Sequence, residues 1–316
     1  MHDSLSASWR RTRTVAAVLI LLTAATGCQF KAGPGDRQWN DAVEPLRHSL
    51  QMDGYRLDYI DSGRGDPVLL VHGFADSTYC FHANFKPLVD AGFRAIAIDL
   101  PGLGRSEAPP EPFVYSIENL AGETLKFADR LGLGRFAIAG SSMGGGIALF
   151  LAERQPERVV RVIAFDPACF SLAGVRWMPL AQNQTLSKAA LSLATPLTVD
   201  LALHDVFWDS SQVNSAVVDE YSRPLAKPGY RNLLRRLIHE YFSAEFDAMT
   251  EHYDTIKSPT LLIWGENDRW VPPEFGPRLQ RLIPDAQLTF APKCGHLPHQ
   301  ERPDIVNPLL IEFLKR

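Results

Sequence analysis

Cysteine is scarce in this sequence, and no group of cysteines has the spacing of a metal-binding motif. Only 4 occur among 316 residues, at positions 28, 80, 169 and 294. The spacing therefore gives no sign of a zinc or iron–sulfur site. In an oxidising compartment Cys80, Cys169 and Cys294 could form one disulfide with one thiol left over, and the sequence does not select the pair. A small buried side chain is the expected role for at least one of them.

Basic runs are also missing from the body of the chain. The formal net charge at pH 7 is −4, which disfavours nucleic acid as the main partner. Hydrophobic residues make up 46% of the chain and charged residues 22%. This is ordinary globular composition, so the sequence excludes a disordered or fibrous protein.

The N-terminal segment differs in composition from the rest of the chain. Arg10, Arg11 and Arg13 precede an apolar run from Val15 to Cys28 that is short for a transmembrane helix and ends in small residues. A basic start, a short apolar centre and a small-residue end are typical of a secretory signal. An uncleaved N-terminal anchor helix is the alternative.

The end of this run, "ATGC", resembles a bacterial lipobox, although Ala25 stands where leucine is usual. The resemblance implies cleavage before Cys28 and lipid modification of that cysteine. We therefore predict a signal peptide over 1–27 and a linker over 28–50. The mature protein is expected to be an exported lipoprotein, anchored to a membrane and facing the periplasm or the cell surface.

Short apolar runs alternate with amphipathic segments along the rest of the chain. Continuous apolar runs are typical of strands that are covered on both faces of a parallel sheet. Strand–helix–strand repetition predicts an α/β fold with a doubly wound, mostly parallel sheet, whose ligands bind at the carboxyl ends of the strands. The predicted strands are Val68–Gly73, Arg94–Gly102, Arg135–Ser142, Arg161–Ala168, Thr260–Asp268 and Ala286–His296.

A G-x-S-x-G motif formed by Gly140, Ser142 and Gly144 follows one of these strands and precedes a helical pattern. A sharp strand-to-helix turn needs small residues around its central residue and raises that residue above the sheet. We therefore interpret Ser142, which has glycine at −2 and +2, as a nucleophile in preference to Ser141. A glycine-rich helix start that is capped by a serine is the alternative.

A serine hydroxyl needs a base, and the base needs an orienting partner. Asp268 and His296 both follow predicted strands, on the same rim of the sheet as Ser142. Three loops that are far apart in the sequence thus supply a nucleophile, a carboxylate and an imidazole in the order Ser…Asp…His.

These motifs resemble those of the α/β-hydrolase superfamily. The resemblance implies that Ser142 is the nucleophile, His296 the general base and acid, and Asp268 the carboxylate that orients the imidazole. It also implies an oxyanion hole formed by the backbone N–H groups of Phe74 and Met143. The motifs that carry the resemblance are "VHGF", "DLPGLGRS", "GSSMGG", "GENDRWVP" and "CGHLPHQERP".

The resemblance further implies a helical cap over residues 169–257, inserted after the sixth strand between two parts of the core, 51–168 and 258–316. This stretch has apolar residues at helical spacing and no obvious strand, and a connection of that length is expected to carry its own structure. We expect its large side chains to form the core of the cap; they include Trp177, Met178, Phe207 and Trp208.

Several polar residues near these motifs have simpler interpretations. Asp166 also follows a strand and is an alternative for the triad carboxylate, although capping of its loop is the expected role. We expect His299 to be structural, His72 to brace the oxyanion loop, Asp99 to order its own loop and Glu266 to be solvated.

The sequence thus predicts a serine hydrolase of the carboxylesterase or lipase kind, which cleaves apolar esters through an acyl-enzyme on Ser142. No metal or organic cofactor is implied. The expected partners are a small apolar ester and a membrane, not nucleic acid. The same fold supports many reactions, so two alternatives stay open: a hydrolase of C–C bonds in ring-cleavage products, and a non-catalytic lipoprotein that binds an apolar ligand.

Overall fold

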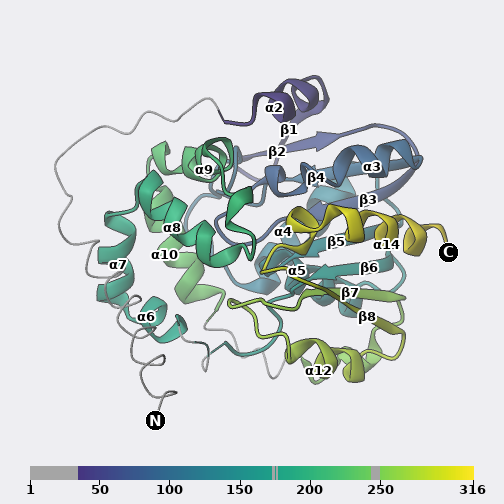
Figure 1. Ribbon diagram of the computed structural model, residues 1–316. Helices are drawn as coiled ribbons and strands as arrows, with labels where there is room; N and C mark the ends of the chain where they lie inside the picture. Colours follow the sequence, from purple (N-terminus) through teal and green to yellow (C-terminus); the bar gives the residue numbers. More distant parts are fainter. Residues whose placement is uncertain (1–34, 173–174, 176, 243–249) are drawn as a thin grey trace, which may run out of the picture.

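An eight-stranded sheet forms the centre of the computed structural model, which describes residues 35–172, 175, 177–242 and 250–316. The strands lie in the order β1-β2-β4-β3-β5-β6-β7-β8 (Figure 1). The strands from β4 to β8 in this order pair parallel, whereas β1 with β2 and β2 with β4 pair antiparallel. The predicted α/β class with a mostly parallel sheet is confirmed.

All six predicted strands are present, although they end before the turn residues that the sequence ranges included. Alternate residues face opposite sides: Leu69 and Val71 lie in one hydrophobic cluster, and Leu70 lies in another. Burial on both faces explains why these strands are continuous apolar runs. The observed bounds are β3 (Asp66–Val71), β4 (Phe93–Ile98), β5 (Phe136–Ser141), β6 (Val159–Phe165), β7 (Thr260–Gly265) and β8 (Ala286–Ala291).

One edge of the sheet is a hairpin of β1 (Arg47–Gln51) and β2 (Arg56–Asp61). Helix α2 (Arg37–Val43) and a 3-10 turn, η1 (Glu44–Leu46), lead into it. Neither strand was predicted: β1 is polar and mostly exposed, as an edge strand often is, and β2 (RLDYID) is buried but carries charged residues that interrupt its apolar run.

The linker predicted for 28–50 is wrong for residues 36–50, which belong to the folded core. Trp39 is buried against Tyr79 and Phe85, with its ring edge-on to both. The Asp36 side chain caps the start of α2 by accepting a hydrogen bond from the Trp39 backbone N–H at 3.0 Å. A single large aromatic residue thus fixes a segment whose composition is typical of a linker.

Helices cover both faces of the sheet (Figure 1). The apolar residues of α4 recur every three or four positions, and Ser116 caps its start by accepting from the Asn119 N–H. One hydrophobic cluster unites the sheet with α2, α3 (Phe85–Asp90) and α14 (Pro303–Lys315); the other unites it with α4 (Ile117–Arg130), α5 (Met143–Arg154) and α12 (Phe275–Leu282). Two short elements, η2 (Thr78–Phe81) and α13 (Pro298–Glu301), lie in loops after β3 and β8.

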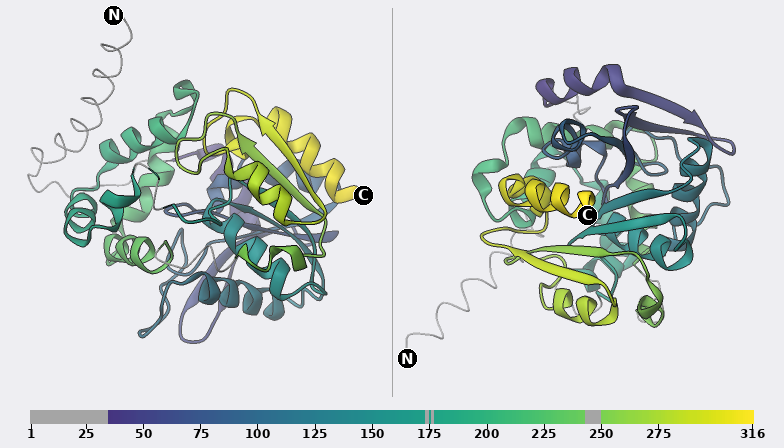
Figure 2. Two further views of the ribbon diagram at one scale, coloured as in Figure 1. Left: turned by 90° about the horizontal axis from the view of Figure 1, so that it is seen from below. Right: turned by 90° about the vertical axis from the view of Figure 1, so that its right-hand side faces the viewer.

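The helices between β6 and β7 lie together at one side of the sheet, on the left in Figure 1 and in the left panel of Figure 2. They are α6 (Met178–Gln182), α7 (Gln184–Ser192), α8 (Pro196–Val206), α9 (Ser215–Ser222) and α10 (Tyr230–Glu240), with 3-10 turns at Ser210–Gln212, Arg223–Ala226 and Tyr253–Thr255. The described part of 169–257 contains no strand. We call the helices α6 to α10 the cap.

Two of the four large residues expected in the cap core are fully enclosed, namely Met178 and Phe207. Trp177 is half-buried, beside Trp270 and Phe242. The expectation for Trp208 is wrong, since this side chain is 44% exposed. Its ring lies under the Arg269 guanidinium at the surface.

The signal peptide and Cys28 lie outside the described residues. Cys80, Cys169 and Cys294 are free and buried, so none of the three forms a disulfide. Within the described ranges, no single helix is long and apolar enough to cross a membrane. Helices α7 and α8 meet such a criterion only as a pair, and the chain bends by 117° between them.

Replacing Trp39 by alanine tests whether residues 36–50 are part of the core. We expect Trp39→Ala to lower the free energy of unfolding by about 3 kcal/mol, because it empties a buried aromatic site. Val114→Ala, at an exposed apolar residue, serves as the control and is expected to change stability by less than about 0.5 kcal/mol. The measurement is urea unfolding of both variants. Equal changes in the free energy of unfolding for Trp39→Ala and Val114→Ala would show that α2 is not anchored to the core.

Candidate active site

Ser142 occupies the turn between β5 and α5 with a φ of +52°, a conformation that non-glycine residues rarely adopt. A Cβ atom on Gly140 would lie 2.1 Å from the Gly144 carbonyl oxygen, and one on Gly144 would lie 2.1 Å from the Val71 carbonyl oxygen. Both glycines are thus required by close backbone approach. The strained turn is of the kind that presents a nucleophile above a parallel sheet.

Ser142 and Ser141 differ in their surroundings. Ser142 is half-buried and lines the pocket beneath the cap, and its side chain makes no capping hydrogen bond to α5. Ser141 is buried. The alternative of a simple serine cap is therefore wrong, and Ser142 is the better placed of the two hydroxyls.

Asp268 and His296 are brought together at the carboxyl ends of β7 and β8. The Nδ1 atom of His296 lies 2.7 Å from Oδ2 of Asp268, and both side chains are buried. The other carboxylate oxygen, Oδ1, accepts from the backbone N–H groups of Trp270 at 2.7 Å and Val271 at 3.1 Å. With Nδ1 held by Asp268, the Nε2 atom of His296 is left to act as a base toward the pocket that Ser142 also lines.

Asp166, the alternative carboxylate, lies directly behind Asp268 at the end of β6. Burial and the Asp268 carboxylate raise the pKa of Asp166 well above its ordinary value, which favours the protonated form of this carboxyl. Its Oδ1 accepts from the Gly265 N–H at 3.0 Å, which ties the ends of β6 and β7. The ligand atoms of Asp166, Asp268 and His296 lie within 4.8 Å of one another, but the His296–Asp268 hydrogen bond already engages two of the atoms that a metal would need.

The loop after β3 that carries Phe74 lies against the nucleophile. A Cβ atom on Gly73 would be 3.2 Å from the Ser142 Cβ, and Phe74 lines the same pocket. Met143 is the first residue of α5 and is fully buried. Both backbone positions are next to Ser142, as an oxyanion hole would require.

His72 holds this loop in place. Its Nδ1 is 2.8 Å from the Gly73 carbonyl oxygen, and its Nε2 accepts from the Leu100 N–H at 3.0 Å. Because Nε2 accepts a hydrogen bond, the ring proton is on Nδ1, which donates to Gly73; burial, which lowers the pKa of His72, also favours this uncharged form. The bracing role expected for His72 is supported by these bonds.

The remaining neighbours take the places that the sequence suggested. Asp99 accepts from the backbone N–H groups of Thr78 and Arg105, each at 2.7 Å, and so orders two loops. His299 is stacked on Phe165, and burial lowers the pKa of His299 to about 3. Glu266 is exposed.

Glu301 is a functional candidate that the sequence analysis missed. Its Oε1 accepts from the Gly295 N–H at 2.9 Å, and its Oε2 accepts from the Trp208 N–H at 2.7 Å. The His296 N–H in turn donates to the Val206 carbonyl oxygen at 2.9 Å. The end of α8 and the loop of the candidate base are therefore fastened together, and Glu301 is a positioning residue. Its place in "GHLPHQER" gave no motif that could have shown this.

A pocket of about 430 Å³ lies between the cap and the ends of the strands, with Ser142 and His296 in its wall. Its surface is largely apolar, and no lysine or arginine is among the described residues that line it. Side chains from α7, α8 and α10 contribute, including Leu191, Val199, Leu203 and Leu234. An apolar ligand is therefore the kind that this pocket would hold.

One corner of the pocket is polar. The Tyr221 hydroxyl donates to Oδ2 of Asp76 at 3.2 Å, and Gln300 donates to the same hydroxyl at 2.7 Å. Burial raises the pKa of Asp76 to about 7. Tyr230 also lines the pocket, and its hydroxyl has no hydrogen-bond partner within the described structure. This corner can therefore receive a neutral hydrogen-bonding group of a ligand.

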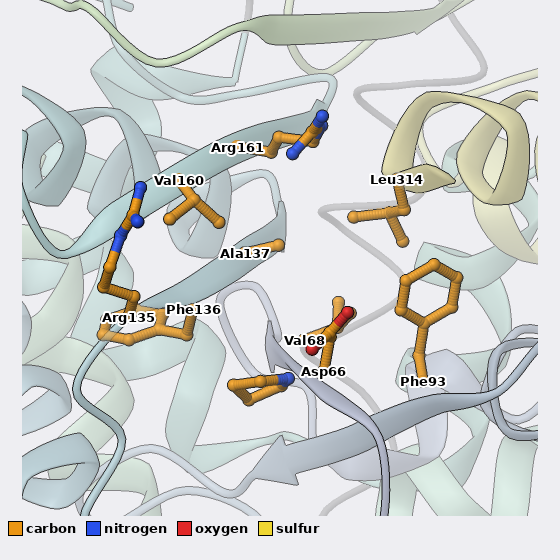
Figure 3. Close-up of a pocket in the computed structure, with 10 residues that line it drawn as sticks. Asp66, Val68, Phe93, Arg135, Phe136, Ala137, Val160, Arg161 and Leu314 are labelled. Carbon is orange, nitrogen blue, oxygen red and sulfur yellow. The ribbon is translucent and has the colours of Figure 1, made fainter. Parts of the chain in front are cut away.

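A second hollow, of about 310 Å³, is shown in Figure 3. It is formed at the beginnings of β3, β5 and β6, where Asp66, Arg135 and Arg161 lie, and Leu314 of α14 forms part of its wall. The amino ends of these strands are at the opposite edge of the sheet from Ser142. This hollow therefore does not belong to the candidate active site.

Comparison with known proteins agrees with this geometry. Residues 66–303 match the family described as alpha/beta hydrolase fold. The chain belongs to the α/β-hydrolase family. This α/β-hydrolase is 30% identical over 287 residues to YugF, an uncharacterized hydrolase of Bacillus subtilis, which covers 87% of this chain and 100% of that protein.

Two further relatives have named reactions. The hydrolase is 30% identical over 271 residues to 2-hydroxy-6-oxo-6-phenylhexa-2,4-dienoate hydrolase of Burkholderia cepacia, which covers 83% of this chain and 92% of the relative. A meta-cleavage product hydrolase from Pseudomonas fluorescens has a solved structure with a TM-score of 0.72 and 27% identity, over 85% of this chain and 97% of that one. The prediction of an ester-cleaving enzyme is wrong in the light of these relatives, which fit the alternative of a C–C bond hydrolase better.

Replacing Asp268 or Asp166 by asparagine is expected to change kcat by very different amounts. Asp268→Asn removes the charge that orients the imidazole and should lower kcat by roughly 10³- to 10⁴-fold. Asp166→Asn is the matched control and should lower kcat by less than about tenfold, because the raised pKa of Asp166 favours its uncharged form and its side chain bonds the Gly265 N–H rather than His296. Steady-state kinetics on one substrate decide the matter. The reverse order of effects would make Asp166 the orienting carboxylate.

Asp76 should make the stability of the fold depend on pH. The pKa of Asp76 is raised from 3.8 to about 7, so the folded state keeps a proton that the unfolded chain releases. This contribution to stability is complete below pH 3.8 and is lost at up to about 1.4 kcal/mol per pH unit as pH rises to 7. The difference in unfolding free energy, Asp76→Asn minus wild type, should therefore grow from pH 4 to pH 7 and then level off. A difference that is constant with pH would contradict this assignment.

Proposed function

We propose that this α/β-hydrolase cleaves a carbon–carbon bond next to a ketone, in an apolar substrate of the ring-cleavage-product type. The observation that carries the proposal is the hydrogen-bonded Asp268–His296 pair, which lines one apolar pocket together with Ser142. Support also comes from the relatives at about 30% identity that are named as hydrolases of 2-hydroxy-6-oxo-dienoates.

The first step is attack on the ketone. His296 accepts the Ser142 hydroxyl proton on Nε2, and the serine oxygen adds to the ketone carbon. Asp268 accepts the Nδ1–H bond throughout and stabilises the imidazolium that forms. The oxyanion would be held by the backbone N–H groups of Phe74 and Met143, at about 3 kcal/mol each.

The second step breaks the C–C bond, and it needs a stabilised carbanion as the leaving group. A 2-hydroxy-6-oxo-dienoate meets this need if its enol proton moves to C5 before Ser142 attacks, because the substrate is then a 2,6-diketone. The C5 carbanion that leaves is then conjugated with the C2 ketone. His296 returns its proton to this fragment, and water then hydrolyses the ester on Ser142. One water is consumed, and a carboxylic acid and a dienol are formed.

The pocket favours a particular kind of substrate. Its described wall offers no lysine or arginine to a carboxylate, so the buried part of the substrate is expected to be uncharged. The corner formed by Asp76, Tyr221 and Tyr230 would take a neutral keto or hydroxyl group.

The N-terminal "RRTRT…ATGC" segment supports a second part of the proposal, that the protein is exported and attached to a membrane through Cys28.

The test is whether the protein consumes 2-hydroxy-6-oxo-6-phenylhexa-2,4-dienoate. The reaction is monitored through the loss of substrate absorbance and the formation of benzoate. We expect the wild-type chain to turn the dienoate over, and we expect kcat to be at least about 10³-fold lower in Ser142→Ala. Ser49→Ala, at an exposed serine on β1, is the control and should match wild type.

Two results would contradict the proposal. One is hydrolysis of p-nitrophenyl esters without any cleavage of the dienoate or of an uncharged 1,5-diketone analogue. The enzyme would then cleave the C–O bond of esters and not a C–C bond. No reaction with any of these compounds would favour the non-catalytic alternative.

A further inference from the structure

Exposed apolar side chains gather on the cap. Six large apolar residues are more than a third exposed among the described residues, and four of them lie between positions 186 and 208, at 44–61% exposure: Leu186, Leu197, Leu201 and Trp208. The other two, Val89 and Val114, lie on separate parts of the core. A concentration of this kind on one segment marks an interaction surface more often than chance does.

Helix α8 carries apolar side chains on two sides, and the exposed pair lies beside Asp200, His204 and Asp205. Val199 and Leu203 point to the pocket side and line the cavity, whereas Leu197 and Leu201, one turn apart, are exposed on the outer side. Exposed apolar side chains that gather in one patch mark a contact with protein or lipid. Nothing among the described residues covers the outer side of α8.

The chain enters the described structure beside the cap. The backbone N–H of Asp36 donates to Oε1 of Glu220 at 2.9 Å, and the Gly35 N–H lies 3.4 Å from Oδ2 of Asp219. Both acidic residues belong to α9, which packs against α8. The residues that precede Gly35 are therefore attached at the cap and not at the opposite end of the sheet.

The length of this connection limits where a membrane can lie. Seven peptide steps separate Cys28, at the end of the apolar run, from Gly35. A fully extended chain of that length spans at most about 25 Å. A bilayer that holds the run from Val15 to Cys28 is thus within about 25 Å of Gly35, which lies against α9 of the cap.

We propose that the outer face of α7 and α8, together with Trp208, docks on a lipid bilayer surface. Leu197 and Leu201 enter the boundary between headgroups and acyl chains, where the amphipathic Trp208 ring is also well placed. An apolar substrate then passes from lipid to the pocket around α8 without crossing water. The docking does not depend on which bond the enzyme cleaves.

The experiment uses the full chain with Cys28→Ser, so that the apolar run remains and only introduced cysteines react. The native Cys80, Cys169 and Cys294 are buried. An environment-sensitive fluorophore is attached at Leu201→Cys, at Leu186→Cys, or at Val89→Cys on α3 as the control. Each protein is reconstituted in phosphatidylcholine–phosphatidylglycerol vesicles, with or without lipids that carry a nitroxide on the acyl chain, and only the floated fraction is measured.

Docking predicts that the nitroxide lipids quench the fluorophore at 201 and at 186 at least about twofold, while the fluorophore at 89 keeps its intensity. Equal quenching at all three positions would overturn the proposal. Shielding of position 201 from aqueous iodide without quenching by nitroxide lipid would also overturn it, because the face would then be covered by the N-terminal segment or by a second copy of the chain. Ester or dienoate turnover is not the readout, so failure of the proposed function leaves this result unaffected.

Discussion

The close approach of three backbone segments around Ser142 is the constraint on which the rest of the site depends. Gly140, Gly144 and the end of β3 leave no room for side chains, and the serine between the two glycines is forced to a φ of +52°. The Ser142 N–H donates to the Phe165 carbonyl oxygen at 2.8 Å, and the Ala168 N–H donates to the Ser142 carbonyl oxygen at 2.9 Å. Because the end of β6 and the loop after it thus hold the turn, strain of a few kcal/mol is retained rather than relaxed.

The cap is fastened to the catalytic rim at the loop that carries His296. The Val206 carbonyl oxygen accepts from the His296 N–H, and Glu301 accepts from both Gly295 and Trp208. A shift of α8 would therefore move the imidazole as well as the wall of the pocket. Since the same helix carries the exposed apolar face, surface binding and the position of the base are mechanically linked.

Local patterns were sufficient to predict the parallel strands, the Ser142 turn and the proximity of Asp268 to His296, because buried strands and close backbone contacts restrict residue types strongly. The polar edge strand β1 and the linker-like segment around Trp39 left no such pattern. Glu301 acts through backbone N–H groups that only the fold brings to it. The bond that is cleaved could not be read from the triad, since attack on an ester and attack on a ketone need the same nucleophile, base and oxyanion donors.

The measurement that tests this account most directly is mass-spectrometric mapping of the full chain after reaction with a fluorophosphonate. Activation through His296 and Asp268 predicts one adduct per chain, located on Ser142, and at least about a hundredfold slower labelling in Asp268→Asn. Absence of an adduct, or an adduct on Ser141 with no dependence on Asp268, would contradict the assignment of Ser142 as the activated nucleophile.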